Sequence, residues 1–240
     1  MLTKTSLALT AISVIAISAP ASAATFGYTN TDFSTNASQA AGIHKSITTT
    51  FNDITDEFTW SSTISRNTRN GHLADGAWLV VSDGPNPKGI DNELAIFYLD
   101  GINNKVSIYN YNGVNGNNSW KRTNPQLLGS IALNVNNSVA DERTFSFNVD
   151  MTDINNLGLS ADWKGTSFSE KIGIWFHATS YSDMTYHNSS GRLKGYSFAK
   201  QSYYDTAFQT TTDIPEPSSL AALGLFAAAA AASKLSKRIA

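Results

Sequence analysis

The stretch "GAWLVVSDGPNPKGIDNELAIFYLDG", from Gly76 to Gly101, decides the fold class. It holds two short apolar runs, each followed by Asp-Gly, with a loop rich in Pro, Gly and Asn between them. Short runs rich in Val, Ile, Phe and Tyr that end in turn residues are typical of β-strands. The stretch therefore predicts two neighbouring β-strands joined by a loop.

Alternating segments lie on both sides of this stretch. In "TFSFNVD" (144–150), we expect Phe145, Phe147 and Val149 to point inward and the residues between them to point outward. Comparable segments occupy residues 58–66, 105–113, 127–135, 171–179 and 192–200. With roughly eight or more strands, no helical period and no internal repeat, the sequence predicts an all-β fold, an antiparallel β-sandwich or jelly roll.

The composition narrows the class of function. The chain has 240 residues, a formal net charge of −2 and no cysteine. This charge offers no basic surface to nucleic acid, and the missing cysteine excludes disulfides and thiolate metal sites. Residues 24–213 are numerous enough to form one domain with a core of its own.

Residues 1–23 have the pattern of a secretory signal peptide. Lys4 precedes an apolar segment from about Leu7 to Ile17, and Ala21-Ser22-Ala23 supplies the small residues that signal peptidase accepts. The apolar segment is shorter than the ~20 residues that a membrane-spanning helix needs. We therefore expect cleavage by signal peptidase after Ala23 and export of the chain.

The C-terminal segment, residues 214–240, combines three features in a fixed order. These are the motif Pro215-Glu216-Pro217, an apolar stretch at 220–232, and the basic residues Lys234, Lys237 and Arg238. Together they resemble the PEP-CTERM sorting signal that exosortases recognise. The resemblance implies a single transmembrane helix that holds the chain in the inner membrane until an exosortase cuts near the motif. The product is then expected in the cell envelope, the exopolysaccharide matrix of a biofilm, or the medium as a secreted protein.

A second resemblance covers part of the domain. Residues 76–101, 109–120 and 171–179 are similar to a recurring family of PEP-CTERM proteins with a concanavalin-like or LamG-like β-sandwich. This resemblance implies a lectin-type jelly roll, although a fold by itself does not give a function.

The patterns expected of an enzyme are missing. Glycosidases of the sandwich type place paired carboxylates on one strand, and the sequence has no Glu-x-Asp-x-x-Glu pattern. It also has no Gly-x-Ser-x-Gly, and its four histidines are scattered. We therefore expect no catalytic residue and no required cofactor.

Carbohydrate binding needs aromatic rings for the apolar faces of sugars and amides or hydroxyls for their OH groups. The loop 109–120 and a second loop around residue 186 supply such side chains, and His177 shares a strand face with Trp175, opposite Ile174 and Phe176. This histidine could pack against Trp175 or belong to a binding face. The candidate ligand-binding residues are Tyr109, Tyr111, Asn112, Asn117, Trp120, His177 and Tyr186.

Oxygen ligands for calcium are grouped in the loop 82–93. The candidates are Asp83, Asn86, Asp91 and Glu93, and carboxylate and amide oxygens are the ligands that Ca²⁺ prefers. The same residue types are also common in turns, so the loop predicts either a structural calcium site or a plain turn.

The sequence thus indicates an exported, exosortase-processed protein with one β-sandwich domain and no catalytic activity. Its expected partners are signal peptidase, exosortase, the membrane before processing, and an exopolysaccharide or other glycan. Two alternatives stay open. One is a structural or adhesive surface protein without sugar affinity, and the other is a secreted polysaccharide hydrolase, which the missing acid pair disfavours.

Overall fold

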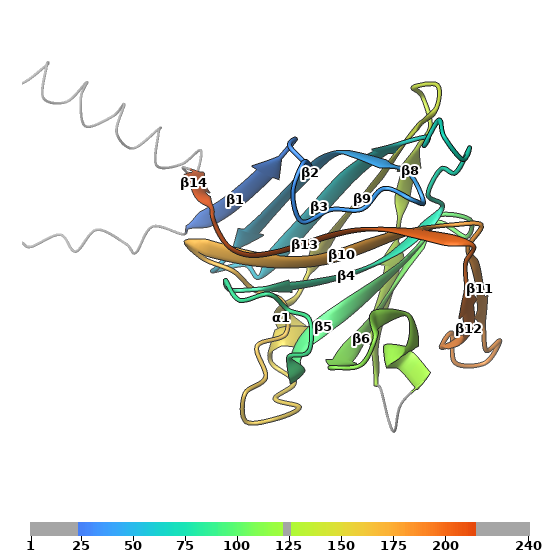
Figure 1. Cartoon of the computed structure of the whole chain (residues 1–240). Coiled ribbons are helices and arrows are strands. Elements are labelled where there is room, and N and C mark those ends of the chain that lie inside the picture. Colours follow the sequence, from blue (N-terminus) through green and yellow to red (C-terminus); the bar gives the residue numbers. More distant parts are fainter. Residues whose placement is uncertain (1–23, 122–125, 215–240) are drawn as a thin grey trace, which may run out of the picture.

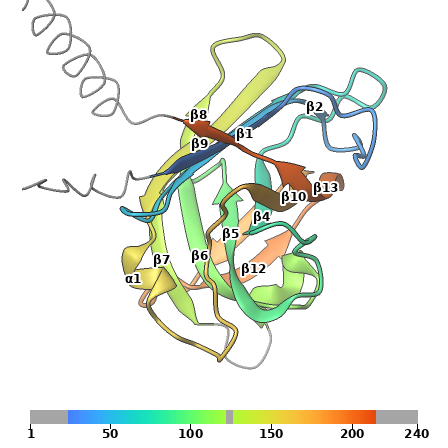
Figure 2. The same cartoon turned by 90° about the vertical axis from the view of Figure 1, so that its left-hand side faces the viewer.

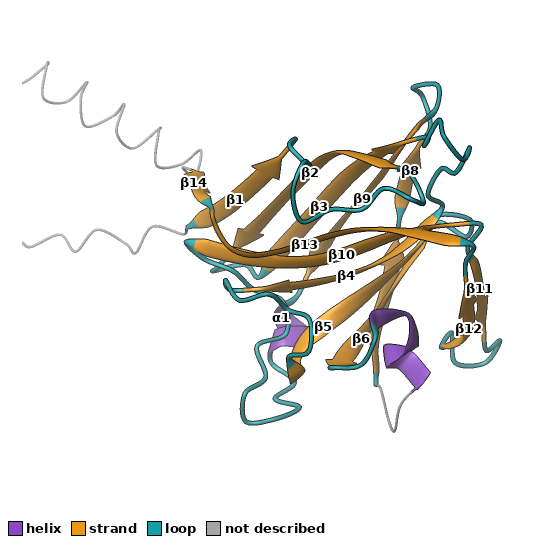
Figure 3. Ribbon diagram, in the orientation of Figure 1, coloured by secondary structure: helices purple, strands orange, loops and turns teal. Residues whose placement is uncertain are grey.

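A computed structural model describes residues 24–121 and 126–214, and in them the chain is all-β (Figure 1). Two large antiparallel sheets form a β-sandwich, and strands make up both layers (Figure 3). The expected signal peptide and the residues of the sorting signal from 215 onward lie outside the described residues. Within the described part of the chain, no helix is long and apolar enough to cross a membrane.

Each large sheet has six strands, and their order mixes segments from distant parts of the chain. Sheet A consists, in spatial order, of β14 (Thr212–Ile214), β1 (Thr25–Asn30), β2 (Ile43–Asn52), β3 (Glu57–Ser65), β9 (Glu142–Asp150) and β8 (Asn134–Asn136). Sheet B consists of β13 (Lys200–Thr210), β10 (Lys171–Ser180), β4 (Gly76–Ser82), β5 (Asp91–Asp100), β6 (Lys105–Asn112) and β7 (Leu127–Ala132). A separate hairpin is formed by β11 (Asp183–Tyr186) and β12 (Leu193–Ser197), and the short helices are η1 (Gly116–Lys121), a 3-10 helix, and α1 (Thr152–Asn155).

The main core fills the space between the two sheets, which Figure 2 shows as separate layers. The expected alternation of β9 is confirmed, because Phe145, Phe147 and Val149 are buried in this core. Thr144, which precedes Phe145, and Asn148, which lies between Phe147 and Val149, face outward. Sheet A thus has one apolar face and one polar face, as is usual for an antiparallel sheet.

Sheet B differs, because in its central strands both faces are buried, whereas its edge strands β7 and β13 keep exposed side chains. All seven residues of β4 are buried, and the side chains of β10 divide between two clusters. Ile174 and Phe176 belong to the main core, whereas Trp175 belongs to a second, largely aromatic cluster on the outer face. The β11–β12 hairpin and η1 contribute Met184, Leu193, Tyr196 and Trp120 to that cluster, so they cover part of the outer face (Figure 1).

Two of the expected strands are divided in the structure. In the segment 127–135, β7 belongs to sheet B and β8 to sheet A, and Leu133 between them is buried. In the segment 192–200, β12 ends at Ser197 and β13 begins at Lys200. Sandwich strands that pass from one sheet to the other bend at the corner, and a local alternation pattern does not mark such a bend.

Both ends of the described chain leave the sandwich at the same edge. Thr25 pairs with Ile214 across β1 and β14, and Lys171 at the start of β10 pairs with Thr210 close by. From there β10 continues for ten residues to Ser180. At ~3.3 Å per residue, the turn after Ser180 lies about 30 Å from the end where the termini emerge.

Candidate functional site

The outer face of sheet B carries a pocket of about 330 Å³. We call it the aromatic pocket, and its lining residues are Trp78, Lys88, Gly89, Tyr111, Gly113, Asn115, Trp175, His177 and Gln201. Two of these, Tyr111 and His177, are among the candidate binding residues named from the sequence. The volume lies at the lower end of the ~300–1,000 Å³ that is usual for small-molecule sites.

The floor of the pocket is a row of stacked rings. His177 lies directly opposite Trp78 of β4 and Tyr203 of β13 in the strand register. Its ring centroid is 4.7 Å from that of Trp78 and 5.6 Å from that of Tyr203, with interplanar angles of 26° and 30°. Trp175, two residues earlier on the same face, meets the His177 ring edge-on at 5.3 Å. The register therefore builds the aromatic floor, because directly opposed side chains on one face of a ladder are in contact.

Three polar groups of this floor have no hydrogen-bond partner among the described residues. They are the indole N–H groups of Trp78 and Trp175 and the Nδ1 atom of His177, all buried. His177 Nε2 lies 3.2 Å from Asp205 Oδ1, and since a carboxylate only accepts, Nε2 carries the hydrogen. In the neutral ring Nδ1 is then an acceptor, so the floor contains two unpaired donors and one unpaired acceptor.

Two loops form the walls of the pocket. The backbone N–H of Gly89 donates to the hydroxyl of Tyr111 at 3.2 Å, which ties the loop after β4 to β6. Burial raises the pKa of Tyr111 to about 12, so this hydroxyl keeps its proton. Gly113, at the end of β6, has φ +70° and lies against the carboxylate of Asp91, where any side chain would collide. A glycine is required there because L-residues rarely adopt that backbone conformation.

The other candidate binding residues do not line this pocket. Tyr109 is completely buried, and its hydroxyl accepts the Leu193 N–H at 2.7 Å. Asn112 is occupied by η1, since its amide donates to Ser119 O at 2.7 Å and accepts from the Ser119 hydroxyl at 2.6 Å. The contacts of these two residues stabilise the fold, and neither residue lines the aromatic pocket.

The remaining three candidates lie around the covering elements. Trp120 is buried in the outer aromatic cluster, and Asn117 accepts from Asn118 within η1 at 3.3 Å. The hydroxyl of Tyr186 donates to Asp100 Oδ2 at 2.7 Å, and burial together with this carboxylate raises the pKa of Tyr186. The aromatic residues of these loops therefore do not form the exposed platform expected for a sugar. They pack against the outer face of sheet B and cover part of it.

The loop proposed for calcium has the contacts of an ordinary turn. Asp83 Oδ1 accepts from both the N–H and the hydroxyl of Ser169 at 2.8 Å, and Asn86 Oδ1 accepts from the Lys88 N–H at 2.9 Å. Asp91 lies against Gly113, and Glu93 is 3.9 Å from Lys164. In the described part of the chain, no three His, Asp or Glu side chains are grouped so that they could hold a metal ion.

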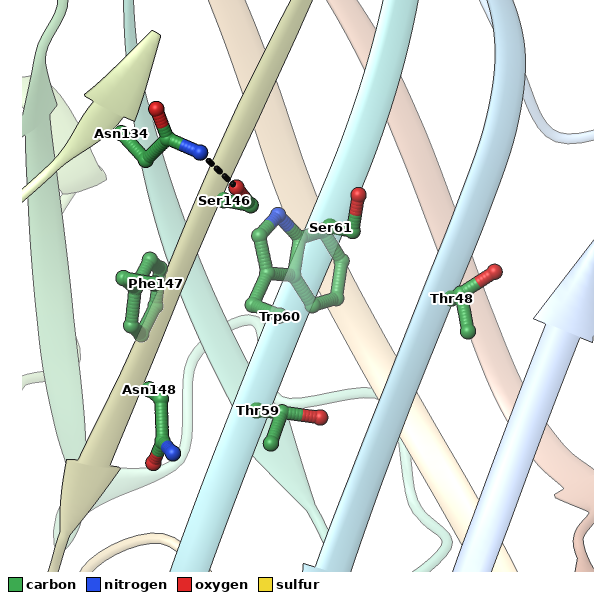
Figure 4. Close-up of a pocket in the computed structure, with 8 residues that line it drawn as sticks. All are labelled: Thr48, Thr59, Trp60, Ser61, Asn134, Ser146, Phe147 and Asn148. Carbon is green, nitrogen blue, oxygen red and sulfur yellow. Dashed lines mark hydrogen bonds between the residues drawn. The ribbon is translucent and has the colours of Figure 1, made fainter.

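Sheet A carries a groove of about 390 Å³ on its outer face (Figure 4). Its outward side chains are hydroxyls and amides, and Asn134 Nδ2 donates to Ser146 Oγ at 3.2 Å. The two aromatic residues at the groove, Trp60 and Phe147, have their rings in the main core. The groove therefore offers no ring face for stacking. The outward residues drawn in Figure 4 are Thr48, Thr59, Ser61, Asn134, Ser146 and Asn148.

Sequence reasoning missed Trp78, Lys88 and Gln201 as pocket residues, whereas Asn115 belongs to the loop 109–120 that was expected to supply amides. Trp78 stands in an apolar run that shows no alternation, because both faces of β4 are buried. The spacing of Trp175 and His177 was a usable signal, since it placed both rings on one face. The polar rim comes from three separate loops or strands that only the fold brings together.

Comparisons of the chain with models of protein families, with curated proteins and with solved structures give no match. A proposal about the function of this chain therefore has to be argued from the geometry of the site.

Proposed function

We propose that this protein is a non-catalytic carbohydrate-binding β-sandwich, of the jelly-roll type, that acts outside the cytoplasm. The observation that carries the proposal is the aromatic pocket. Its floor is a row of aromatic rings with buried polar atoms that have no partner among the described residues, and its rim holds the amides of Asn115 and Gln201. A sugar combines an apolar ring face with hydroxyls that both donate and accept, and so it matches both kinds of group.

We favour binding over catalysis because of what surrounds the His177–Asp205 pair. A His–Asp pair assists hydrolysis when a nucleophile or a second acid stands beside it. The lining residues that the structure describes include no Ser, Thr, Asp or Glu. Hydrolysis by a glycosidase with paired carboxylates or by a serine-hydrolase triad would require such a group at the pocket.

The location outside the cytoplasm is supported by the sequence of the two termini. Residues 1–23 have the pattern of a signal peptide, and Pro215-Glu216-Pro217 begins the segment that resembles a PEP-CTERM signal. In this proposal, signal peptidase and exosortase process the chain, and the domain then binds exopolysaccharide in the envelope or matrix. A structural or adhesive role without sugar affinity is the competing proposal.

The test is glycan binding by the segment 24–214, which contains all the strands described above. Calorimetric titration with the exopolysaccharide of the producing cells and a glycan panel should give saturable binding. Gln201→Ala, at the exposed rim of the pocket, should weaken that binding about tenfold through the loss of its hydrogen bonds. Ser61→Ala, on the outer face of sheet A, is the matched control and should leave it unchanged. Absence of binding to every glycan would overturn the proposal and favour the structural role.

A further inference from the structure

A smaller pocket of about 150 Å³ lies at the end of the sandwich away from the termini. It is formed where the β3–β4 loop, β9 and the turn after β10 meet. We call it the arginine pocket, and its lining residues are Arg66, Gly71, Leu73, Asp75, Arg143 and Tyr181. Tyr181 follows Ser180, so the pocket lies about 30 Å, the length of β10, from the edge where the chain ends emerge.

Both guanidinium groups are held in place by two hydrogen bonds each. Arg66 donates from Nε to Asp141 Oδ1 and from Nη1 to Gly71 O, both at 2.8 Å. Arg143 donates from Nε to Asn137 Oδ1 at 2.9 Å and from Nη1 to Ala74 O at 2.7 Å. Neither Nη2 group has a hydrogen-bond partner among the described residues. The pocket thus has two fixed cations with donors to spare.

The charge of the lining residues is positive, since two guanidiniums face one carboxylate, that of Asp75. Asp75 Oδ1 already accepts the Ser182 N–H at 2.9 Å. Asp141, the partner of Arg66, lies outside the lining, and its side chain is 69% exposed. Arg143 has no ion pair within the described part of the chain. Arg143 is therefore the cation without a paired carboxylate, and with the spare Nη2 donors it favours an anionic group over a cationic one.

Tyr181 places an exposed ring beside these cations. Its side chain is 71% exposed, and its backbone has φ +51°, which bulky residues rarely adopt. The ring of His72 meets it edge-on at 5.2 Å, and the Nδ1 atom of His72 lies 2.7 Å from the Ser180 hydroxyl. The aromatic ring is therefore held outward at a fixed position, where a sugar could pack against it.

We propose that the arginine pocket binds the carboxylate of an acidic sugar in an anionic polysaccharide. The planar carboxylate accepts from the Nη2 groups of Arg66 and Arg143, and the sugar ring packs against Tyr181. The small volume admits the charged substituent of one sugar unit. This site is separate from the aromatic pocket, and the proposal stands whether or not that pocket binds a glycan.

Oligogalacturonate and its methyl ester test the proposal on the purified full-length chain, because the ester keeps the sugar rings and replaces each charged carboxylate by a neutral ester. The acid should bind at least about tenfold more tightly than the ester, since hydrogen bonds to charged groups are the stronger ones. Added salt should weaken binding of the acid and leave that of the ester unchanged. Equal affinity for acid and ester, or no binding of either, would overturn the proposal.

Variants locate the binding site. Arg143→Gln should weaken oligogalacturonate binding about tenfold or more. Tyr181→Gly should weaken it several-fold without lowering the unfolding temperature, because glycine accepts a positive φ. Lys45→Gln removes an exposed cation elsewhere and should change nothing. The proposal is wrong if Lys45→Gln has the effect of Arg143→Gln. It is also wrong if Gln201→Ala, at the aromatic pocket, abolishes binding of the acid while Arg143→Gln does not.

Discussion

The imidazole of His177 stacks on the indole of Trp78, with their centroids 4.7 Å apart and their planes 26° from parallel. The two residues are directly opposite each other in the β10–β4 ladder, so the backbone register sets the contact. Asp205 holds the far side of the imidazole. The floor of the aromatic pocket is therefore formed before any ligand arrives, which lowers the entropic cost of binding.

The indole N–H of Trp175 can be tested apart from its ring. Trp175→Phe keeps an aromatic ring at the pocket and removes the unpaired donor. If a glycan hydroxyl accepts from this N–H, affinity should fall about tenfold, as expected for one hydrogen bond. The fluorescence change on glycan addition should shrink as well. Trp60→Phe, in the core between the sheets, should preserve the affinity, and an equal loss in both variants would contradict a local effect.

Gly113 should be essential to the wall of the aromatic pocket. Gly113→Ala places a Cβ against the carboxylate of Asp91 and also strains a backbone at φ +70°. The added Cβ meets only the end of the exposed Asp91 side chain, which can move aside, so we expect a loss of about 1–2 kcal/mol in the free energy of unfolding and weaker glycan binding. Gly71→Ala is the matched control, because Gly71 has φ +76° and nothing within 4 Å of the added Cβ. Its loss should be about 1 kcal/mol, and equal losses in a denaturant titration would show that the collision is unimportant.

Much of the fold was predictable from local pattern. The inward residues of β9 and the shared face of Trp175 and His177 follow from the two-residue period of a strand. β2 and β13 were missed. Their sequences, "IHKSITTTFN" and "KQSYYDTAFQT", have so many polar residues that the apolar alternation is weak. Both segments are strands because of their neighbours in the sheets: β2 pairs with β1 and β3, and β13 pairs with β10.

The candidate site was less predictable, because burial on the outer face of sheet B depends on distant segments. Tyr109 and Tyr111 share one face of β6, and nothing local distinguishes them. The N–H of Leu193, more than eighty residues later, covers the Tyr109 hydroxyl, while Tyr111 lies at the pocket. Arg66 of the β3–β4 loop and Arg143 of β9 likewise line one pocket although they are far apart in the sequence. Only the fold brings such residues together.

The hairpin over sheet B should depend on one hydrogen bond to a buried carboxylate. Asp100 is 2% exposed and accepts from the hydroxyl of Tyr186 at 2.7 Å. Tyr186→Phe removes this bond and should lower the free energy of unfolding by about 1.5–3 kcal/mol. Amide hydrogen exchange in β11 and β12 should accelerate. Tyr203→Phe, at a half-exposed ring, serves as the control and should have little effect on either measurement.

The unfolding free energy should decrease as the pH is lowered, because of His44. This residue is 4% exposed, its ring stacks on Phe33 at 5.3 Å, and burial, with a smaller contribution from the charge of His177, lowers its pKa to about 4. The unfolded chain has an ordinary histidine pKa of about 6.5 and binds a proton first as the pH falls. The stabilisation is therefore complete above pH ~6.5 and is lost progressively toward pH ~4.

His44→Leu removes the titrating group and keeps an apolar side chain against Phe33. Between pH 7 and pH 5 the natural chain should lose about 2 kcal/mol more unfolding free energy than the variant. Denaturant titrations at both pH values measure this difference, because each gives an unfolding free energy in water. His187→Gln, at an exposed histidine, should keep the pH dependence of the natural chain. If His44→Leu keeps that dependence too, the acid sensitivity must come from other groups.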